Sequence, residues 1–325
     1  MSADPRPLVS VIIVNWNTRD LLRACLASLP HGSSAMRLEA IVVDNGSTDG
    51  SVEMVRAEHA QVVLLRNAAN LGFTRATNQA LRRASGDLIF LLNSDTEVRP
   101  GCIERLLEVA ASDERIGAAG PRLLNPDGSH QVSAGPFPRL VHRLLPSRFE
   151  RRYERRLQAR LEVPGDCTAT VDWLSGAALF LRRDVLEAVG PLDERYLMWY
   201  DDLDWAQRVR RAGYARVFVG DAEVVHHGRQ SGTQLPDRDL AAQLFDGEYT
   251  YLRLHSGRLG TALVFALRIA KALVRRASDR PEARADAAFR LAYHVGCWRR
   301  FCWARWPEPE PTEPGPAAAD ERRQR

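Results

Sequence analysis

Short apolar runs alternate with stretches of helical periodicity through the first 120 residues, and this alternation limits the possible folds more than any other feature. The runs are rich in Val, Ile and Leu and apolar at successive positions, which is typical of strands buried on both faces. They are Val9–Val14, Ala40–Val43, Val62–Leu65 and Leu88–Leu92. The helical stretches between them are Thr18–Leu29, Gly50–Glu58 and Phe73–Ala84. Strand–helix repeats at this interval predict an α/β fold, with a mostly parallel sheet flanked by helices.

Polar side chains stand at the ends of three of these runs. Asn15, Asp44 and the segment Asn93–Asp95 each follow a predicted strand. In open α/β sheets, ligands bind at the carboxyl ends of the strands. We therefore expect these residues to share one binding edge.

The segment Asp44–Ser51 ends a strand and opens a helix. Its small, turn-forming residues would let backbone N–H groups and the helix N-terminus approach a polar ligand. The structural alternative is a turn with a helix cap, supplied by Thr48 or Asp49, just as Thr74 would cap the next helix. Taken alone, the segment favours that alternative.

A carboxylate also follows the fourth run. Asp95 stands where a hard cation that bridges diphosphate oxygens needs an oxygen ligand, although it would equally well cap a turn. His226 comes after the strand-like segment Ala215–Val219. A lone histidine is more often structural, so His226 gains weight as a metal ligand only if the fold brings it to Asp95.

Three acids fall within four positions at the start of the predicted helix Asp201–Ala212. The helix dipole explains one or two of them, and Asp204 can pair with Arg208 one turn later. Asp202 and its neighbour Asp201 lie beside aromatic residues that would raise the pKa of a carboxyl and stack on a sugar. This turn is the best candidate for a general base.

The chain changes character after residue 120. Residues 121–138 are turn-rich, 139–162 are dense in arginine, and 237–305 have helical character. We expect a tail over 1–7, one α/β domain over 8–236 with halves at 8–120 and 121–236, a basic insertion at 139–162, a helical extension over 237–306, and a disordered tail over 307–325.

Five scattered cysteines without a CxxC pair indicate reduced thiols. The N-terminus lacks the pattern of a signal peptide, and no run of about 18 apolar residues suggests a spanning helix. These features predict a cytoplasmic protein.

Two segments bear on a membrane partner. Residues 139–160 carry eight arginines against two glutamates, which is either a solvated face or a site for phosphate groups of anionic lipid or of a lipid-linked acceptor. Leu259–Val274 is apolar except for Arg268 and Lys271, which share one helical face with Arg275. It would either rest in a membrane interface or pack as a buried helix. Basic and aromatic residues that follow favour the interface, and no interleaved pattern indicates nucleic acid.

These motifs, in this order, resemble those of the family 2 glycosyltransferases, and within them the bacterial rhamnosyltransferase-like branch. The matching segments are Val9–Asn17, Val43–Gly50, Asn70–Phe73, Gly86–Thr96, Trp173–Ala178, Met198–Trp205, and His226 with Gly228 and Ser231. Seven collinear motifs over residues 8–232 are far more specific than any one of them.

The resemblance implies a GT-A fold, with a nucleotide-binding half followed by an acceptor half. It implies that Asp202 is the catalytic base and that Asp95 holds a divalent metal, Mg²⁺ or Mn²⁺. It implies that His226 is a second ligand of this metal or a contact of the diphosphate. The donor-binding residues it implies are Asn15, Asn17, Asp44, Asn45, Asn70, Gly72, Asn93 and Ser94. The sugar and acceptor pocket it implies is formed by Trp173, Ser175, Gly176, Trp199 and Asp201.

One position departs from the family pattern. The usual metal motif is Asp-x-Asp, and Asn93 here replaces the first aspartate. One carboxylate is left for the metal, which predicts weaker metal binding. The implied reaction is a single inverting displacement, in which Asp202 takes the acceptor proton as the nucleoside diphosphate leaves.

The resemblance alone suggests dTDP-rhamnose as the donor and a glycan or lipid-linked acceptor; other deoxyhexoses, galactofuranose and hexoses remain open. A sugar nucleotidyltransferase would carry a basic Gly-rich loop where Asn15-Trp16-Asn17 stands, and a nicotinamide dehydrogenase would carry GxGxxG there. The non-enzymatic alternative is a degenerate subunit that binds nucleotide sugars without transferring them.

Overall fold

The computed structural model describes residues 4–29, 35–138, 140, 167–228, 236–277 and 281–302. The first part of the chain forms the expected strand–helix repeat. Its strands are β1 (Leu8–Asn15), β2 (Arg37–Asp44), β3 (Val63–Arg66) and β4 (Leu88–Asn93). Its helices are α1 (Arg19–Ser28), α2 (Ser51–Glu58) and α3 (Phe73–Arg83). These four strands pair in parallel, as predicted.

The following segment completes the domain. Its elements are β5 (Thr96–Val98), α4 (Cys102–Ser112), β6 (Ile116–Leu124), β7 (His130–Gln131), β8 (Ala134–Gly135), β9 (Thr168–Val171), β10 (Trp173–Leu174), β11 (Ala178–Arg182), α7 (Arg183–Val189), α8 (Asp201–Arg211) and β12 (Ala215–His226). Over the described residues, ten strands form one sheet whose main path is β3-β2-β1-β4-β11-β6-β12-β5. β11 runs antiparallel to both β4 and β6, so the sheet is mixed, and parallel mainly in its first half.

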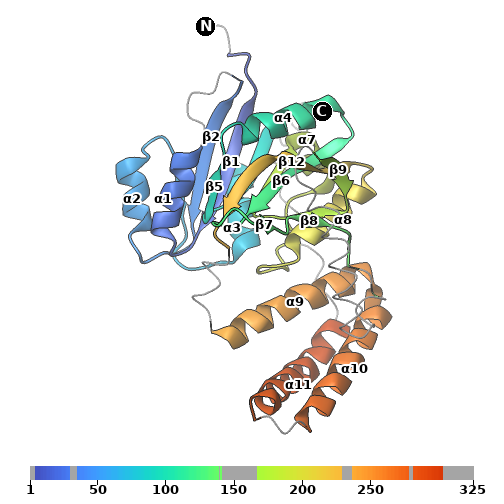
Figure 1. Ribbon diagram of the computed structural model, residues 1–325. Helices are drawn as coiled ribbons and strands as arrows, with labels where there is room; N and C mark the ends of the chain where they lie inside the picture. The colour runs from blue at the N-terminus through green and yellow to red at the C-terminus, as the bar shows by residue number, and fades with distance from the viewer. Residues whose placement is uncertain are drawn as a thin grey trace, which may run out of the picture.

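Helices cover both faces of the sheet, as Figure 1 shows. On one face α1, α2 and α4 pack against alternate residues of β1, with Val9, Val11 and Ile13 in that core. The other face has a second core that includes Ile12. There α3 packs against β1 and β2, α7 against β11, and α8 against β10 and β12. The alternation follows from the strand geometry, because successive side chains point to opposite faces.

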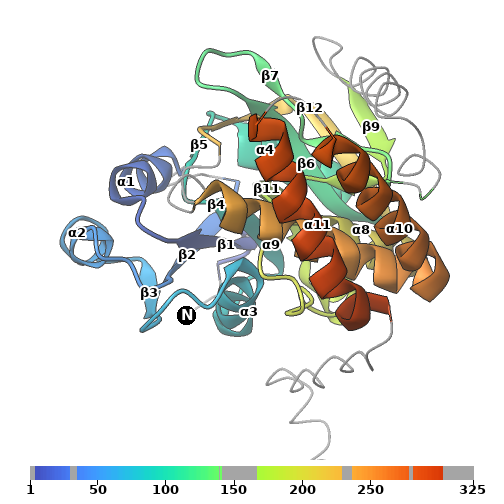
Figure 2. The same ribbon diagram turned by 90° about the horizontal axis from the view of Figure 1, so that it is seen from below.

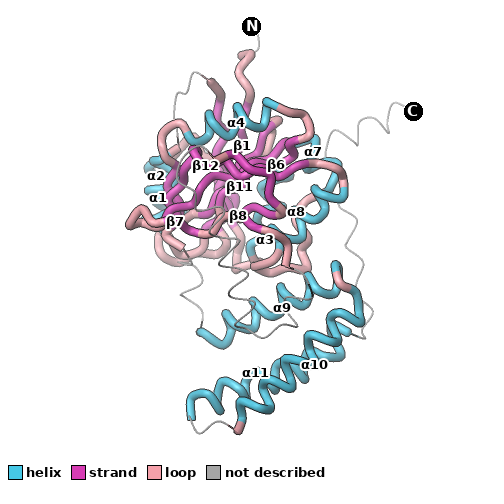
Figure 3. Tube along the Cα trace, turned by 45° about the vertical axis from the view of Figure 1, so that its right-hand side comes forward, coloured by secondary structure: helices cyan, strands magenta, loops and turns pink. Residues whose placement is uncertain are grey.

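Three helices form a separate layer beneath the sheet (Figure 1 and Figure 3). They are α9 (Asp237–His255), α10 (Gly257–Arg276) and α11 (Pro281–Cys302). The view from below places all three in front of the domain (Figure 2). They have their own small core, formed by Tyr249, Leu252, Val264, Phe265, Phe301 and Cys302. None of the helices that the structure describes is both long enough and apolar enough to cross a membrane.

The sequence patterns did not reveal α4 and β6. β6 has the sequence IGAAGPRLL, whose small residues and proline give a weak strand signal. Tertiary packing explains them, because a Cβ at Gly117 would lie 2.7 Å from Tyr214 and one at Gly120 would lie 2.7 Å from Leu174. Two short strands, β7 and β8, lie within the stretch 121–138, which the sequence predicted to be turn-rich.

The strand ending at the two histidines is longer than predicted. β12 extends to His226 instead of Val219, and its register shifts between Val219 and Glu223. This bulge interrupts the strand-like run of residues, so the sequence predicted that the strand ends at Val219. The basic insertion 139–162 lies outside the described residues apart from Leu140, and so do Ser231 and the tail 307–325.

Candidate functional site

The strand-end residues meet at one edge of the sheet. In the β1–β2 pairing Asn15 lies opposite Asp44, and in the β1–β4 pairing Val14 lies opposite Asn93. Parallel strands that end in register bring their last side chains together, which is the arrangement expected of a binding edge.

Asn15 is the centre of a buried hydrogen-bond network at this edge. Its Nδ2 donates to Asp44 Oδ2 at 3.2 Å and to Ser47 Oγ at 3.1 Å. Its Oδ1 accepts from Thr18 Oγ1 at 2.7 Å, and the Thr18 and Ser94 hydroxyls are 2.8 Å apart. The network connects β1, β2 and β4, so the edge is held in place before any ligand arrives.

Asn17 joins the first loop to the second. Its backbone has a positive φ of 51°, which asparagine tolerates. Its N–H donates to Ser47 Oγ at 2.9 Å, and its Oδ1 accepts from Thr48 N at 2.7 Å. Asp44 Oδ1 accepts from Ser47 N at 3.0 Å, so the turn after β2 is fixed from both sides.

The predicted helix caps need correction. Gly50, with φ of 86°, precedes α2, while Asp49 accepts from Ser51 N and from Arg19 N at the starts of α2 and α1. Thr48 does not cap α2. Thr74 does not cap α3 either, because its hydroxyl donates to the carbonyl of Tyr196, where the loop before α8 covers the start of α3.

Asn45, Asn70 and Gly72 fasten the third loop. Asn45 Nδ2 donates to Asn70 Oδ1 at 2.9 Å and to Gly72 O at 3.2 Å, while its Oδ1 accepts from Leu71 N. Gly72 has φ of 89°, and a Cβ there would lie 2.4 Å from the Leu197 side chain. The geometry therefore shows these three residues holding the second and third loops against the loop before α8.

Asp95 and His226 converge, as a shared metal site requires. β5 pairs with β12 so that Thr96 lies opposite His226. His226 Nε2 is 3.3 Å from Asp95 Oδ1 and 3.5 Å from Asn93 Nδ2. Residues 131 positions apart in the chain thus meet at the edge. His227 turns instead to Glu97, 2.8 Å away.

Gln131 orients the His226 ring, a role that no pattern in the sequence indicated. Its Oε1 lies 2.5 Å from His226 Nδ1, while its Nε2 donates to Asn125 Oδ1 at 2.9 Å. Asn125 Nδ2 donates in turn to Ser129 Oγ, so the chain of donors places the His226 proton on Nδ1. Nε2 then presents a lone pair toward Asp95, which is the tautomer that a metal-binding histidine adopts when its other nitrogen donates to an outer partner.

This arrangement fits a divalent cation. A lone pair and a carboxylate oxygen face each other at 3.3 Å, and such a pair needs a proton or a cation between them. Two neighbouring ligands of octahedral Mg²⁺ lie about 3 Å apart, given bonds of about 2.1 Å. Among the residues described, no group of three or more His, Cys, Asp and Glu side chains could hold a metal alone. Mg²⁺ commonly takes one or two protein ligands and completes its shell with water and substrate phosphates.

The acids of α8 occupy different environments. Asp201 is buried, and burial together with the charge of Asp202 raises its pKa to about 8. Burial also raises the pKa of Asp202, but its carboxylate accepts backbone N–H bonds from Gly176 at 3.1 Å and Leu203 at 2.8 Å. Those donors stabilise the charged form. Burial and the neighbouring charge thus favour the protonated form of Asp201, whereas the two N–H bonds favour the ionised form of Asp202.

Asp204 is structural, as predicted from its spacing to Arg208. Arg208 Nε donates to Asp204 Oδ2 at 3.0 Å, and His255 Nε2 lies 2.8 Å from Asp204 Oδ1. Burial opposes the charge of Asp204, but the His255 hydrogen bond and the Arg208 charge more than offset it and lower the pKa of this carboxyl. His255, which the sequence did not single out, fastens α9 to α8.

The backbone before α8 is strained. Trp199 and Tyr200 have φ of 72° and 67°, and bulky residues rarely adopt this conformation. Among the described residues, Trp199 Nε1 is buried with no hydrogen-bond partner. Such orphaned donors are uncommon in folded proteins and mark positions where a ligand can bind.

The residues around Gly176 lie against this turn. The Asp202 bond to Gly176 N brings the segment Trp173–Gly176 to the start of α8. Trp173 Nε1 donates to Pro136 O at 3.1 Å, and Ser175 Oγ accepts from Ala177 N at 3.2 Å. Their polar atoms are thus used in fixing the loop, while the indole ring of Trp173 stays partly exposed.

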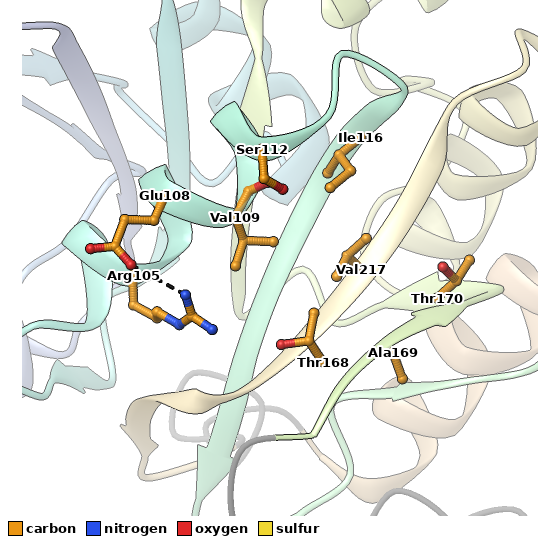
Figure 4. A pocket seen from close by; sticks show the side chains of 9 residues that line it. All are labelled: Arg105, Glu108, Val109, Ser112, Ile116, Thr168, Ala169, Thr170 and Val217. Carbon is orange, nitrogen blue, oxygen red and sulfur yellow. Dashed lines mark hydrogen bonds and ion pairs between the residues drawn. The ribbon is translucent and has the colours of Figure 1, made fainter.

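A hollow of about 390 Å³ lies between α4 and β9, and Figure 4 shows its lining, with Arg105 paired to Glu108. It contacts β12 at Val217, nine residues before His226. At about 3.3 Å per residue this separates it from the binding edge by roughly 30 Å. The hollow therefore belongs to another part of the surface.

Comparison with known proteins adds independent evidence. The family model "Glycosyl transferase family 2" matches residues 10–184. An N-acetylglucosaminyl-diphospho-decaprenol L-rhamnosyltransferase of Mycobacterium tuberculosis is 34% identical over 285 residues, which cover 82% of this chain and 91% of the relative.

Two solved structures share the fold. A mannosyltransferase from Pyrobaculum calidifontis in complex with GDP-Man and Mn²⁺ matches with a TM-score of 0.53 and 20% identity, over 92% of this chain and 88% of that one. GalNAc-T7 with UDP, GalNAc and Mn²⁺ matches with a TM-score of 0.52 and 18% identity, over 69% of this chain and 44% of that one. The predicted GT-A fold is confirmed.

Proposed function

This chain belongs to glycosyl transferase family 2 and is a glycosyltransferase, and we propose that it transfers L-rhamnose from dTDP-rhamnose to a hydroxyl of a lipid-diphosphate-linked sugar in cell-envelope synthesis. The observation that carries the transferred sugar and the acceptor is the mycobacterial relative, whose similarity extends over nearly its whole length. The dTDP nucleotide follows from the family resemblance. We also propose the domain division made above, with donor binding in residues 8–120 and acceptor binding in 121–236.

The donor would bind at the sheet edge. Asp44 and Asn17 hold the turn that would meet the nucleotide, and the Asn15 network would keep it rigid. Asp95 Oδ1 and His226 Nε2 would hold a divalent metal, with Asn93 beside them. When bound, the metal supplies positive charge for the diphosphate that leaves.

Asp202 would take the proton from the acceptor hydroxyl. Its two backbone donors keep it ionised, and protonation of Asp201 would remove the repulsion that two adjacent charges create. A base with a raised pKa accepts a proton more readily near neutral pH, so the environment suits general-base catalysis. The displacement would invert the anomeric centre, since no protein nucleophile is required.

The acceptor sugar would lie between the Trp173 segment and the loop before α8. Trp199 offers an unused indole N–H, and the partly exposed ring of Trp173 offers a face for the apolar side of a sugar. A lipid-linked acceptor also requires the enzyme to work at a membrane. We propose that it does so as a cytoplasmic protein on the inner face.

The test supplies purified protein with Mg²⁺ or Mn²⁺, a panel of nucleotide sugars, and a short polyprenyl-diphospho-N-acetylglucosamine acceptor. We expect mass spectrometry to find one added deoxyhexose with dTDP-rhamnose and none with UDP- or GDP-sugars. Addition of another sugar would contradict the donor assignment. Binding of dTDP-rhamnose without transfer or hydrolysis would favour the degenerate binding subunit, which the replacement of a metal carboxylate by Asn93 keeps as the second candidate.

A further inference from the structure

The outer side of α10 exposes apolar side chains along its whole length. Leu259, Leu263 and Leu273 are 83%, 55% and 53% exposed. With the exposed Ala266 and Ala270 they repeat at intervals of three and four residues, so they form one straight stripe along the helix. From Leu259 to Leu273 the stripe measures about 21 Å at about 1.5 Å per residue.

The stripe continues into a groove between α10 and α11. The groove has a volume of about 550 Å³ and is lined only by apolar or aromatic residues: Ala266, Ile269, Ala270, Leu273, Val295 and Trp298. Val295, on α11, is itself 54% exposed. We call the stripe and the groove together the α10–α11 face. A contiguous apolar surface of this kind marks a docking site in a folded protein.

The opposite side of α10 packs on the rest of the molecule. Arg268 lies about 180° around the helix from the stripe, at about 100° per residue, and donates to Glu248 on α9 at 2.5 Å. Arg268 does lie on the same side of α10 as Lys271, about 60° away, as the sequence pattern indicated. Its guanidinium, however, is held against Glu248 and is mostly buried. α9 in turn contacts α8 through His255, and a Cβ at Gly247 would lie 2.8 Å from Trp199 O. The order from the outside inward is α10–α11 face, α9, candidate site.

The positive charge of α10 indicates which kind of partner binds the α10–α11 face. α10 contains five basic residues and no acidic one in its 20 positions. Arg258, Lys271 and Arg276 are exposed and lie roughly 100–120° from the centre of the stripe, where long basic side chains reach lipid headgroups while the stripe enters the acyl region. A second copy of this chain would oppose one basic helix to another, so self-association on this face is disfavoured.

We propose that the α10–α11 face binds the surface of an anionic lipid bilayer and holds the candidate site close to its lipid-linked acceptor. The inference rests on the proposed function for the acceptor alone, since the binding itself concerns residues outside the catalytic machinery. It assigns the membrane contact to α10 and α11.

The test is co-sedimentation of the full chain with vesicles of phosphatidylglycerol and phosphatidylcholine, compared with phosphatidylcholine alone. We expect binding to the anionic vesicles that weakens as salt rises. The triple variant R258Q/K271Q/R276Q should bind about a hundred-fold more weakly, since each basic residue near an anionic surface contributes about five-fold. The matched control R56Q/R82Q/R83Q removes the same charge from exposed positions on α2 and α3 and should bind like the parent.

The double variant L263Q/L273Q tests the apolar stripe separately. We expect at least about a ten-fold loss of vesicle binding, unchanged thermal unfolding, and unchanged transfer to a short water-soluble acceptor. Equal binding of this variant and the parent to anionic vesicles would overturn the proposal. So would light scattering that shows a parent dimer converted to monomer by L263Q/L273Q. Vesicle binding is measured without any sugar transfer. A failure of the membrane proposal can therefore be told apart from a failure of the proposed transferase activity.

Discussion

Two regions of this protein reverse the usual distribution of polar and apolar side chains. At the sheet edge Asn15, Asp44 and Asp95 are almost fully buried, whereas on α10 Leu259 and Leu263 are mostly exposed. Buried polar groups are tolerated because they bond to one another, and exposed leucines gain nothing comparable from the chain itself. The polar groups at the edge therefore bond to one another within the protein, whereas the apolar side chains of the α10–α11 face would be covered only by a partner.

The largest effect is expected beside the edge, at the start of α8, from Asp202→Asn. Loss of the base should lower kcat by about 100-fold to 10,000-fold, the usual range for general catalysis, with little change in donor affinity. Transfer rates and donor titration by calorimetry measure the two quantities. If the Asp202→Asn variant transfers sugar at the parent rate, Asp202 is not the base. The reactive region would then be less clearly distinct from the docking face.

Asp95→Ala should weaken metal-dependent donor binding by about 100-fold or more, because loss of a ligand exceeds the 10-fold to 100-fold effect of its outer partners. A thermal-shift titration with nucleotide diphosphate, with and without Mn²⁺, reports this directly. As a control, Glu97→Ala changes a partly exposed carboxylate nearby that pairs with His227. If Asp95→Ala and Glu97→Ala behave alike, the edge does not hold the metal through Asp95.

Gln131→Leu should reduce metal affinity by about 10-fold to 100-fold, because His226 would lose the acceptor that fixes its tautomer. Gln131→Glu keeps an acceptor at Nδ1 and should restore most of the binding. Metal titration followed by donor-dependent stabilisation separates the two variants. Equal losses in both would mean that Gln131 acts through the fold of the β7 turn and not through the imidazole.

The smallest effect concerns stability. The pKa of Asp201 is raised from 3.8 to about 8, so the folded state holds a proton that the unfolded chain releases. Its stabilising contribution is fully present below about pH 4 and is lost as pH rises through about 8. Unfolding free energy should fall across this window by at most about 1.4 kcal/mol per pH unit. Asp201→Asn should flatten that slope in urea unfolding at several pH values; an unchanged slope would contradict a protonated Asp201.

The first four strands show how far local sequence reaches. Their Val and Ile runs, and the helices between them, were predicted within a few residues, since each run carries its own periodicity and the parallel order places Asn15, Asp44 and Asn93 at one edge. The family motifs extended this to Asp95, Asp202 and His226. β6 was not predictable in this way, because its small residues form a strand only by pairing with β11 and β12 and by fitting under Tyr214 and Leu174.

What the sequence determined by itself was the set of side chains available to the site, because residue type and strand position are local properties. The tertiary structure decided how they are used. It brought His226 to Asp95 from 131 residues away and placed Gln131 against the His226 ring. It also gave Asp201 and Asp202 different surroundings, since the N–H groups of Gly176 and Leu203 bond to Asp202. It also turned Arg268 inward and left Leu263 outward on the same helix. Distance, burial and hydrogen-bond partners arise only when remote segments pack, and no local pattern contains them.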